Sequence, residues 1–297
     1  MPPTKLKYVL ITAAKNEAQF IELTIKSVLK QSVLPLKWVI VNDGSTDETE
    51  QIVKKYADKY PWIELLSLPP SSDRHFGRKA MAFNKGYEKI KDLDYDIIGN
   101  LDADISFDDE DYFSFLLNKF KVNPKLGVAG TPFKQGKSQY DYRFSRKEHV
   151  SGACQLFRRE CFTSIGGYIP RKEGGVDLAA VVMARMNGWE TETFTDKYCI
   201  HNRPMGKAGP HFIRYTFISG YGDYQFGVHP LWQTLRSVYQ MTRQPYIISG
   251  LLLWLGYFWA LITRAPRAVS QEFTNFRRQE QSNYLKEYLN KIISKIG

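Results

Sequence analysis

The chain has 297 residues, a formal net charge of +10, 43% hydrophobic residues and 24% charged residues. These fractions exclude wholesale disorder, collagen and a coiled coil, and the length allows one large α/β domain with an appendage or two smaller domains. The three cysteines are too few for a disulfide framework and form no Cys-x-x-Cys, which favours a reducing compartment. Residues 1–7 contain no apolar run, so we expect no secretory signal.

Strands and helices are predicted to alternate through the first hundred residues. Short apolar runs predict the strands, and apolar residues at helical spacing predict the helices between them. We expect strands over residues 8–12, 37–41, 63–68 and 95–101, and helices over 17–30, 49–60 and 79–90. This alternation is typical of βαβ units and a Rossmann-like, mostly parallel sheet flanked by helices, which binds ligands at the carboxyl ends of its strands.

Polar segments follow three of these predicted strands. Residues 13–17 read Ala-Ala-Lys-Asn-Glu, residues 42–47 read Asn-Asp-Gly-Ser-Thr-Asp, and residues 102–104 read Asp-Ala-Asp. Together they predict an acidic crevice at one edge of the sheet. The sequence has neither a Gly-x-Gly-x-x-Gly motif nor a P-loop motif, so a phosphate bound in this crevice would need a bridging cation.

Asp102 and Asp104 are the candidates for holding that cation. At an extended strand end, residues i and i+2 point to the same face, and two adjacent carboxylates repel each other unless a counter-ion lies between them. Carboxylate oxygens suit Mg²⁺ or Mn²⁺, which keep coordination positions open for diphosphate oxygens. The alternative is that Asp-x-Asp only starts the next helix, as the acids at 108–111 are expected to do.

The motifs of this chain occur in an order that a known enzyme family shares. They are Ala14-Lys15-Asn16-Glu17, residues 41–47, residues 77–86, residues 101–104, residues 150–154, Ile165-Gly166-Gly167-Tyr168 and Asp177-Leu178-Ala179. The set closely resembles family 2 of the inverting nucleotide-sugar glycosyltransferases, which have the GT-A fold. The resemblance covers about residues 6–205 and implies a catalytic domain over 1–205, with a nucleotide-binding half over about 1–104 and an acceptor half over about 105–205.

The resemblance implies roles for individual residues of a donor site. Asp43 would hydrogen-bond the nucleobase, and Ala13 and Glu17 would line the nucleoside pocket. Arg78 and Lys79 would face the base or the diphosphate as charge-assisted partners. The structural alternatives are an Asx turn closed by Asp43, a place in the first helical turn for Glu17, and an exposed helix start for the two cations.

The resemblance also implies a divalent metal ion, Mg²⁺ or Mn²⁺. Asp104 would bind the metal, and Asp102 would reach the metal or the ribose. His201 would complete the metal or diphosphate shell, followed by a mobile basic lid over residues 203–209. A single histidine is otherwise more often structural or exposed.

Asp177 is the candidate catalytic residue. Inverting transfer needs one general base for the acceptor hydroxyl, because the metal stabilises the diphosphate leaving group. The family usually has Glu-Asp at the start of this helix, whereas this chain has Val176-Asp177. Glu173, beside the Gly174-Gly175 pair, is the second candidate, and a plain N-cap is the structural alternative for Asp177.

The C-terminal third differs from the rest of the chain in charge and hydropathy. Residues 201–297 hold 12 Lys and Arg against 4 Asp and Glu, a net +8, which leaves only +2 for the first 200 residues. Helices are expected over 214–224, 231–240 and 273–296, and the run 244–263 contains no charge. A helical, membrane-associating region over 206–297 is therefore predicted, with 244–263 lying on the bilayer, inserting into it or spanning it. The alternative is a fully buried helix.

These observations predict a metal-dependent inverting glycosyltransferase. It would move a sugar from a nucleotide diphosphate sugar to a carbohydrate or lipid-linked acceptor, in cell-surface polysaccharide or glycolipid synthesis. We expect it at the cytoplasmic face of the cell membrane, or otherwise in the cytoplasm, bound to an anionic surface and not to nucleic acid. The alternatives are a catalytically silent binding module, which Val176 in place of the usual acid would suit, and a nucleotidyltransferase, which would need a Gly-rich basic loop where residues 13–17 stand.

Overall fold

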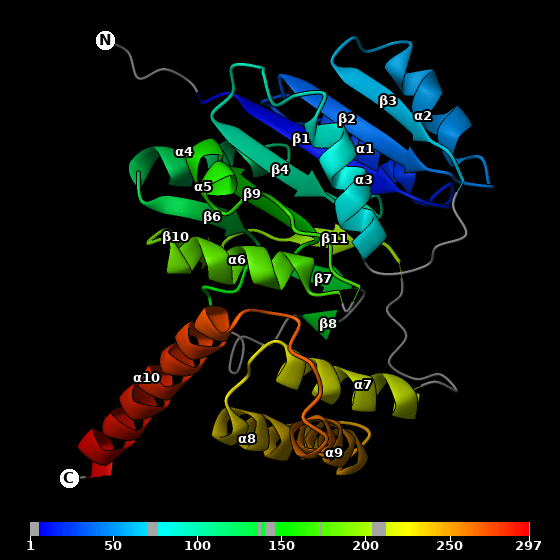
Figure 1. The fold of residues 1–297 in the computed structure, drawn as a ribbon. Helices are drawn as coiled ribbons and strands as arrows, with labels where there is room; N and C mark the ends of the chain where they lie inside the picture. The colour runs from blue at the N-terminus through cyan, green and yellow to red at the C-terminus, as the bar shows by residue number, and fades with distance from the viewer. Residues whose placement is uncertain are drawn as a thin grey trace. The chain divides into compact units, whose positions relative to one another are not determined.

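A computed structural model of the chain describes residues 6–70, 77–135, 138–139, 146–172, 174–203 and 212–296. The chain divides into two compact units, residues 1–205 and residues 206–297. Figure 1 shows the course of the chain through both of them.

The first unit is built on a seven-stranded sheet with the strand order β10-β6-β9-β4-β1-β2-β3. Its strands are β1 (Tyr8–Ala14), β2 (Lys37–Asp43), β3 (Ile63–Leu68), β4 (Ile97–Leu101), β6 (Leu126–Gly130), β9 (Cys154–Arg158) and β10 (Glu190–Thr193). Strand β9 runs antiparallel to both of its neighbours, β4 and β6, and the other neighbouring pairs are parallel. The prediction of a mostly parallel sheet is therefore confirmed.

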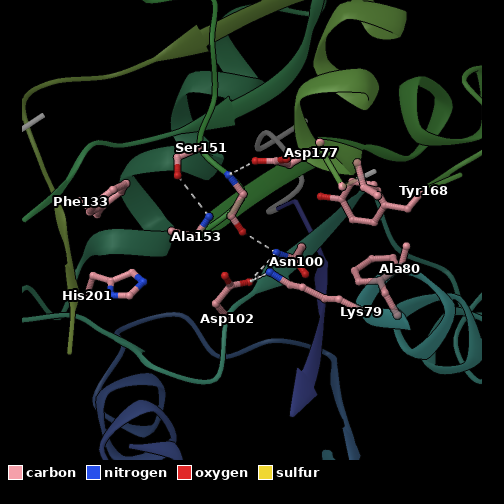
Figure 2. Close-up of a pocket in the computed structure, with 15 residues that line it drawn as sticks. Lys79, Ala80, Asn100, Asp102, Phe133, Ser151, Ala153, Tyr168, Asp177 and His201 are labelled. Carbon is pink, nitrogen blue, oxygen red and sulfur yellow. Dashed lines mark hydrogen bonds and ion pairs between the residues drawn. The ribbon is translucent and has the colours of Figure 1, made fainter. Parts of the chain in front are cut away.

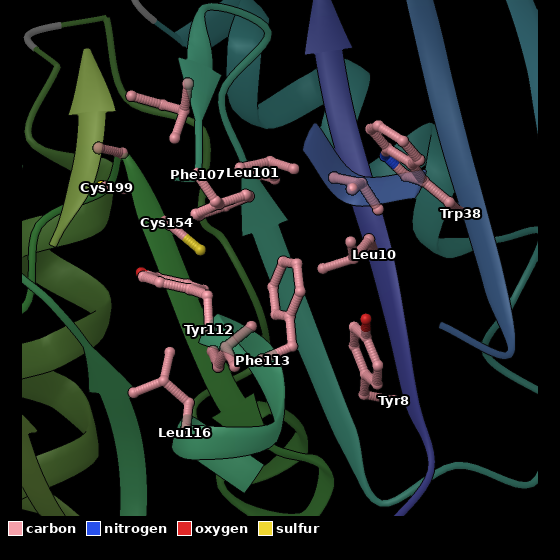
Figure 3. Packing of buried hydrophobic residues seen from close by; sticks show 14 of the residues in the cluster. Tyr8, Leu10, Trp38, Leu101, Phe107, Tyr112, Phe113, Leu116, Cys154 and Cys199 are labelled. Carbon is pink, nitrogen blue, oxygen red and sulfur yellow. The ribbon is translucent and has the colours of Figure 1, made fainter. Parts of the chain in front are cut away.

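Helices cover both faces of this sheet (Figure 1). Apolar side chains of α1 (Ile21–Leu29), α2 (Thr49–Ala57) and α4 (Tyr112–Val122) pack on one face, and those of α3 (Gly77–Tyr87), α5 (Arg159–Ser164) and α6 (Val176–Met186) on the other. Figure 3 shows part of the first cluster, in which the rings of Tyr8 and Phe113 stack with centroids 5.0 Å apart beside the fully buried Leu10 and Trp38. Because the β1, β2 and β4 strands are buried on both faces, they read as apolar runs in the sequence.

A second, four-stranded sheet lies beside the end of β4. It has the order β5-β11-β7-β8 and consists of β5 (Ile105–Ser106), β11 (Cys199–His201), β7 (Phe133–Gln135) and β8 (Ser138–Gln139). The antiparallel pairing of β11 with β5 sets His201 opposite Ile105. This pairing brings His201 next to Asp104, although the two residues are far apart in the sequence.

The polar segments that follow β1 and β2 meet at one edge of the main sheet. The N–H of Asn16 donates to Ser45 Oγ at 3.0 Å, and the N–H of Thr46 donates to Asn16 Oδ1 at 2.8 Å. The N–H of Glu17 donates to Thr49 Oγ1 at 2.7 Å. These hydrogen bonds give the backbone N–H groups of the loop after β1 their partners and hold it against the loop after β2. Polar loops are expected to meet in this way where the strand order of an α/β sheet reverses.

The second unit is helical, with α7 (Phe212–Gln225), α8 (Pro230–Met241), α9 (Ile248–Ile262) and α10 (Gln271–Ile296). Helices α7 and α9 approach closely at two glycines. A Cβ on Gly220 would lie 2.0 Å from the Leu253 carbonyl oxygen, and one on Gly256 would lie 2.0 Å from the Phe217 carbonyl oxygen. Such close backbone approach is possible only where a side chain is missing.

Helix α9 buries one side and exposes the other. Leu253, Gly256, Tyr257 and Ala260 are buried, whereas the Trp259 side chain is 58% exposed. The alternative that residues 244–263 form a fully buried helix is therefore wrong. Among the described residues, no helix combines the length and apolar character that crossing a membrane requires.

Leu10→Ala should lower the free energy of unfolding by about 2–5 kcal/mol, because Leu10 is fully buried between packed layers and its loss leaves a cavity. Urea titration measures this change. Leu23→Ala is the matched control, since Leu23 is 48% exposed, and it should change the free energy of unfolding far less. Equal losses in the two variants would contradict the assigned core.

Candidate active site

Asp43, at the end of β2, is held by Arg78 at the start of α3. Arg78 Nε donates to Asp43 Oδ2 at 2.9 Å, and a second guanidinium nitrogen contacts Oδ1, so the pair is bidentate. The Asx turn after β2 is closed by Asn42, whose Oδ1 accepts from the Ser45 N–H at 3.0 Å. The prediction that Asp43 could be the turn-closing residue is therefore wrong, and its carboxylate faces Arg78. Ala13, half-buried near the end of β1, pairs in register with Val41 just before this site.

Arg203 links two of the predicted carboxylates. Its Nε donates to Asp104 Oδ2 at 3.1 Å, and its guanidinium also contacts the Glu17 carboxylate. Burial raises the pKa of Glu17, and the nearby Arg203 acts against that rise. Helix α1 begins only at Ile21, so Glu17 lies in the preceding turn and not in the first turn of a helix.

Asp104 and His201 face each other. His201 Nε2 lies 3.8 Å from Asp104 Oδ2, and both side chains are nearly buried. His201 Nδ1 lies 2.8 Å from the Arg203 carbonyl oxygen, which fixes the ring with Nε2 toward the carboxylate. A carboxylate oxygen and an imidazole nitrogen are suitable ligands for a divalent cation. In the part of the chain that the structure describes, no group of three or more His, Cys, Asp or Glu side chains could hold a metal ion, so further ligands would have to come from elsewhere.

A cavity of about 310 Å³ opens at the carboxyl end of β4 (Figure 2). Its walls come from β4, the starts of α3 and α6, the segment before β9, and the small sheet. The lining residues are Lys79, Ala80, Phe83, Asn100, Asp102, Phe133, Ser151, Gly152, Ala153, Tyr168, Gly174, Gly175, Val176, Asp177 and His201. The cavity therefore brings together Lys79, Asp102, Asp177 and His201 of the predicted site, whereas Asp43, Glu17 and Asp104 lie outside its lining.

Asp102 pairs with Lys79 across this cavity. Lys79 Nζ lies 2.5 Å from Asp102 Oδ1. Loss of hydration raises the pKa of Asp102, and the Lys79 charge acts in the opposite direction. For Lys79, loss of hydration favours the neutral form, but the Asp102 carboxylate outweighs it and the pKa of Lys79 is raised.

The Asp102–Asp104 segment is a turn and not an extended strand end, so that part of the prediction is wrong. Strand β4 ends at Leu101, and the N–H of Ile105 donates to the Asp102 carbonyl at 3.2 Å. The alternative that these acids start a helix is also wrong, because β5 follows directly and α4 begins only at Tyr112. The two carboxylates have different basic partners, Lys79 for Asp102 and Arg203 for Asp104.

Asp177 is the second residue of α6 and lies on the wall of the cavity away from Asp102 (Figure 2). Gly175, with a φ of 64°, occupies the N-cap position, so the N-cap alternative for Asp177 is wrong. Asp177 Oδ2 accepts a hydrogen bond from the N–H of Gly152 at 3.2 Å. Glu173 and residues 204–209 of the predicted lid lie outside the described residues.

Sequence reasoning gave no individual role to four residues that build this site: Asn100, Gly152, Tyr168 and Arg203. Gly152 and Tyr168 fall within the motifs at 150–154 and 165–168, and Arg203 begins the predicted lid, so the sequence carried a signal for these three. Asn100 sits inside an apolar run, where a single polar residue was the available signal.

The fold and the site define the class of protein. A mostly parallel sheet with an antiparallel strand beside β4, and a polar site at the carboxyl ends of β1, β2 and β4, is the GT-A fold of nucleotide-sugar glycosyltransferases. The family model described as Glycosyl transferase family 2 matches residues 9–174, more than half of the chain. The chain belongs to this family, as the sequence motifs predicted.

Curated relatives match about half to two thirds of the chain. Poly-beta-1,6-N-acetyl-D-glucosamine synthase of Staphylococcus epidermidis is 29% identical over 192 residues, which are 64% of this chain and 43% of that protein. The synthase of the same name from Staphylococcus aureus strain COL is 32% identical over 142 residues, 48% of this chain and 32% of that protein. The matched residues thus cover less than half the length of each of these relatives.

Solved structures share the fold at low sequence identity. The mannosyltransferase PcManGT from Pyrobaculum calidifontis, in complex with GDP-Man and Mn²⁺, has a TM-score of 0.57 at 18% identity and covers 96% of this chain and 82% of its own. Residues 1–349 of Staphylococcus aureus TarS, in complex with UDP-GlcNAc, have a TM-score of 0.52 at 16% identity and cover 85% of this chain and 72% of their own.

Proposed function

We propose that the chain is an inverting glycosyltransferase that moves a sugar from a nucleotide diphosphate sugar to an acceptor hydroxyl, with residues 1–205 as its catalytic domain. The observation that carries this proposal is the position of Asp177. Its carboxylate lines the same cavity as Asp102 and Lys79, so a group able to take a proton stands across from groups able to bind the donor.

The donor would lie along the carboxyl ends of the strands. Asp43, with Ala13 and Glu17, would bind the nucleoside. Arg78 and Lys79 would face the base or the diphosphate of the donor as charge-assisted partners. The staphylococcal relatives are poly-beta-1,6-N-acetyl-D-glucosamine synthases, and TarS has been solved in complex with UDP-GlcNAc. UDP-GlcNAc is therefore the first donor to test.

In the reaction, Asp177 would accept the proton of the acceptor hydroxyl as that oxygen bonds to the anomeric carbon. The bond between this carbon and the diphosphate oxygen breaks on the opposite side, and its electron pair leaves with the nucleoside diphosphate. The Gly152 N–H holds Asp177 Oδ2, so Oδ1 is the oxygen left to face the acceptor. Val176, which takes the place of the family's usual acid, contributes only apolar surface to this wall.

A divalent cation, Mg²⁺ or Mn²⁺, would be held by Asp104 and His201, with Asp102 nearby. When bound, it would neutralise the charge that develops on the diphosphate. The nearly buried, mutually facing carboxylate and imidazole support this assignment, as does the Mn²⁺ in the PcManGT complex. Arg203 occupies one side of Asp104 and would have to share that carboxylate or move from it.

The second unit would place this chemistry at a membrane. Exposed apolar residues form one stripe on α9, at Ile248, Leu251, Leu255, Trp259 and Ile262, and another on α8, at Leu231, Leu235 and Val238. The α9 spacing keeps these side chains on one side of the helix, opposite its buried residues. We refer to the stripe on α9 as the apolar face.

The charges around the apolar face have one predominant sign. Residues 212–267 contain five arginines and one acid, Asp223, which pairs with Arg236. Arg243 and Arg264 are exposed at the two ends of α9. Tryptophan and arginine at the border of an apolar stripe are typical of helices that lie in the interface of an anionic bilayer, where each basic residue contributes about 1 kcal/mol. A lipid-linked acceptor would be presented there.

Asp177→Asn should lower kcat by about two to four orders of magnitude, because an amide cannot take the acceptor proton, while donor affinity is retained. Transfer from UDP-GlcNAc and calorimetric binding of UDP measure the two effects. Asp196→Asn removes an exposed acid of the same unit and should leave kcat unchanged. If Glu173→Gln lowers kcat and Asp177→Asn does not, the base is Glu173.

Asp104→Asn and His201→Ala should each weaken Mn²⁺ binding at least tenfold, because each removes one of two protein ligands. Titration of free Mn²⁺ by electron paramagnetic resonance measures this without relying on activity. Asp108→Asn, at an exposed acid nearby, is the control and should bind Mn²⁺ as the unaltered chain does. Full transfer activity in excess chelator would show that the reaction needs no divalent cation.

The full chain should float with vesicles containing anionic phospholipid and less with neutral ones. Leu255→Glu combined with Trp259→Glu should abolish flotation, because two charges would enter the apolar face. Leu23→Glu, at an equally exposed apolar residue of the first unit, should float normally. Absence of flotation together with a dimer in light scattering would show that the apolar face joins two copies of the chain instead.

A further inference from the structure

Gly152 stands between the two carboxylates of the cavity. Its N–H donates to Asp177 Oδ2 at 3.2 Å, and its carbonyl oxygen accepts from Asn100 Nδ2 at 2.6 Å (Figure 2). The same Nδ2 lies 3.1 Å from Asp102 Oδ1, which also receives Lys79. The Asn100 side-chain amide therefore donates one hydrogen to Asp102 and the other to the Gly152 carbonyl.

The segment that contains Gly152 is fixed by strand β4. Pairing of β4 with β9 sets Asn100 opposite Gln155, and the N–H of Asp102 donates to the Ala153 carbonyl at 2.9 Å. The Gln155 side chain closes the other end of the segment by donating to the Val150 carbonyl at 2.9 Å. Asn100 is 3% exposed, so its amide is costly to bury unless it keeps these partners.

Gly152 also touches Asp177 directly. A Cβ on Gly152 would lie 2.8 Å from Asp177 Oδ2, 2.9 Å from its Cβ and 3.0 Å from its Cγ. The Asp177 side chain thus packs against the bare Cα of Gly152, and a methyl group at this point would push the carboxylate away from its present position.

We propose that Asn100 is a positioning residue for the base: it holds Gly152 so that the Gly152 N–H and Cα orient the Asp177 carboxylate. Because the same amide donates to Asp102, the orientation of the base is tied to the carboxylate on the donor side. This inference rests on the proposed function and adds to it a residue that acts through Gly152 and does not itself take the proton.

A double-mutant cycle tests this inference. Asn100→Ala and Gly152→Ala should each lower kcat about tenfold in the otherwise unaltered chain. In the Asp177→Asn background, Gly152→Ala should change the residual kcat less than twofold, because there is no base left to orient, and Asn100→Ala should keep only the part of its loss that comes through Asp102. Gly152→Ala should leave the affinity for UDP unchanged, since the three atoms nearest to an added Cβ all belong to Asp177. Asn100→Ser, which keeps one donor, covers the case in which the alanine variant does not fold.

Gln31→Ala is the matched control. Gln31 is 6% exposed, and its Nε2 donates to the Asp109 carbonyl at 2.7 Å and to the Ser27 carbonyl at 3.3 Å, so it is a buried amide with two bonds that lies outside the cavity lining. It should leave kcat unchanged. Losses of kcat that multiply fully in the Asp177→Asn background, or an equal loss in Gln31→Ala, would overturn the positioning role. No transfer from any nucleotide sugar by the unaltered chain would instead refute the proposed function, and an unaffected Asp177→Asn would refute the assigned base.

Discussion

The site depends on one structural feature, the antiparallel pairing of β9 with β4. This pairing places residues 151–153 directly beside the end of β4, where the N–H of Asp102 bonds to the Ala153 carbonyl. Asp102 and the backbone that holds Asp177 are therefore parts of one hydrogen-bonded ladder. A parallel neighbour would bring its own carboxyl end to this edge of the sheet, whereas the antiparallel β9 brings the segment that precedes it, residues 151–153.

Four of the seven strands of the main sheet were predicted, and for the inner ones burial on both faces leaves a direct mark in the sequence. Strand β1, predicted over 8–12 and found over Tyr8–Ala14, is almost entirely buried and reads as a short apolar run. The polar residues of the site were predictable for a related reason. Ligand-binding groups of an α/β sheet gather where parallel strands end, so the segments after β1, β2 and β4 could be expected to meet.

The remaining features depend on contacts between distant segments and could not be predicted from local pattern. Arg203 reaches Glu17 across 186 positions of the chain, and the pairing that brings His201 to Asp104 involves strands of only two and three residues. Strands that short have too few residues to show alternation. The choice between Asn42 and Asp43 as the turn-closing residue likewise depended on Arg78, whose place at the start of α3 offers the better partner for a carboxylate.

The basic partners of the carboxylates differ in how much of their side chains water can reach. The Asp43 and Arg78 side chains are 8% and 17% exposed, and they form a bidentate ion pair. Separating them would leave each charge with little water to solvate it. Lys79 and Arg203 are 50% and 44% exposed, so about half of each side chain reaches water although the carboxylates they contact are more buried. In the proposed donor site, the Asp43–Arg78 end of the crevice would therefore stay fixed, while Lys79 and Arg203 would exchange a carboxylate for a phosphate. Binding of a donor would then begin on a preformed surface and rearrange only the residues nearest the bond that breaks.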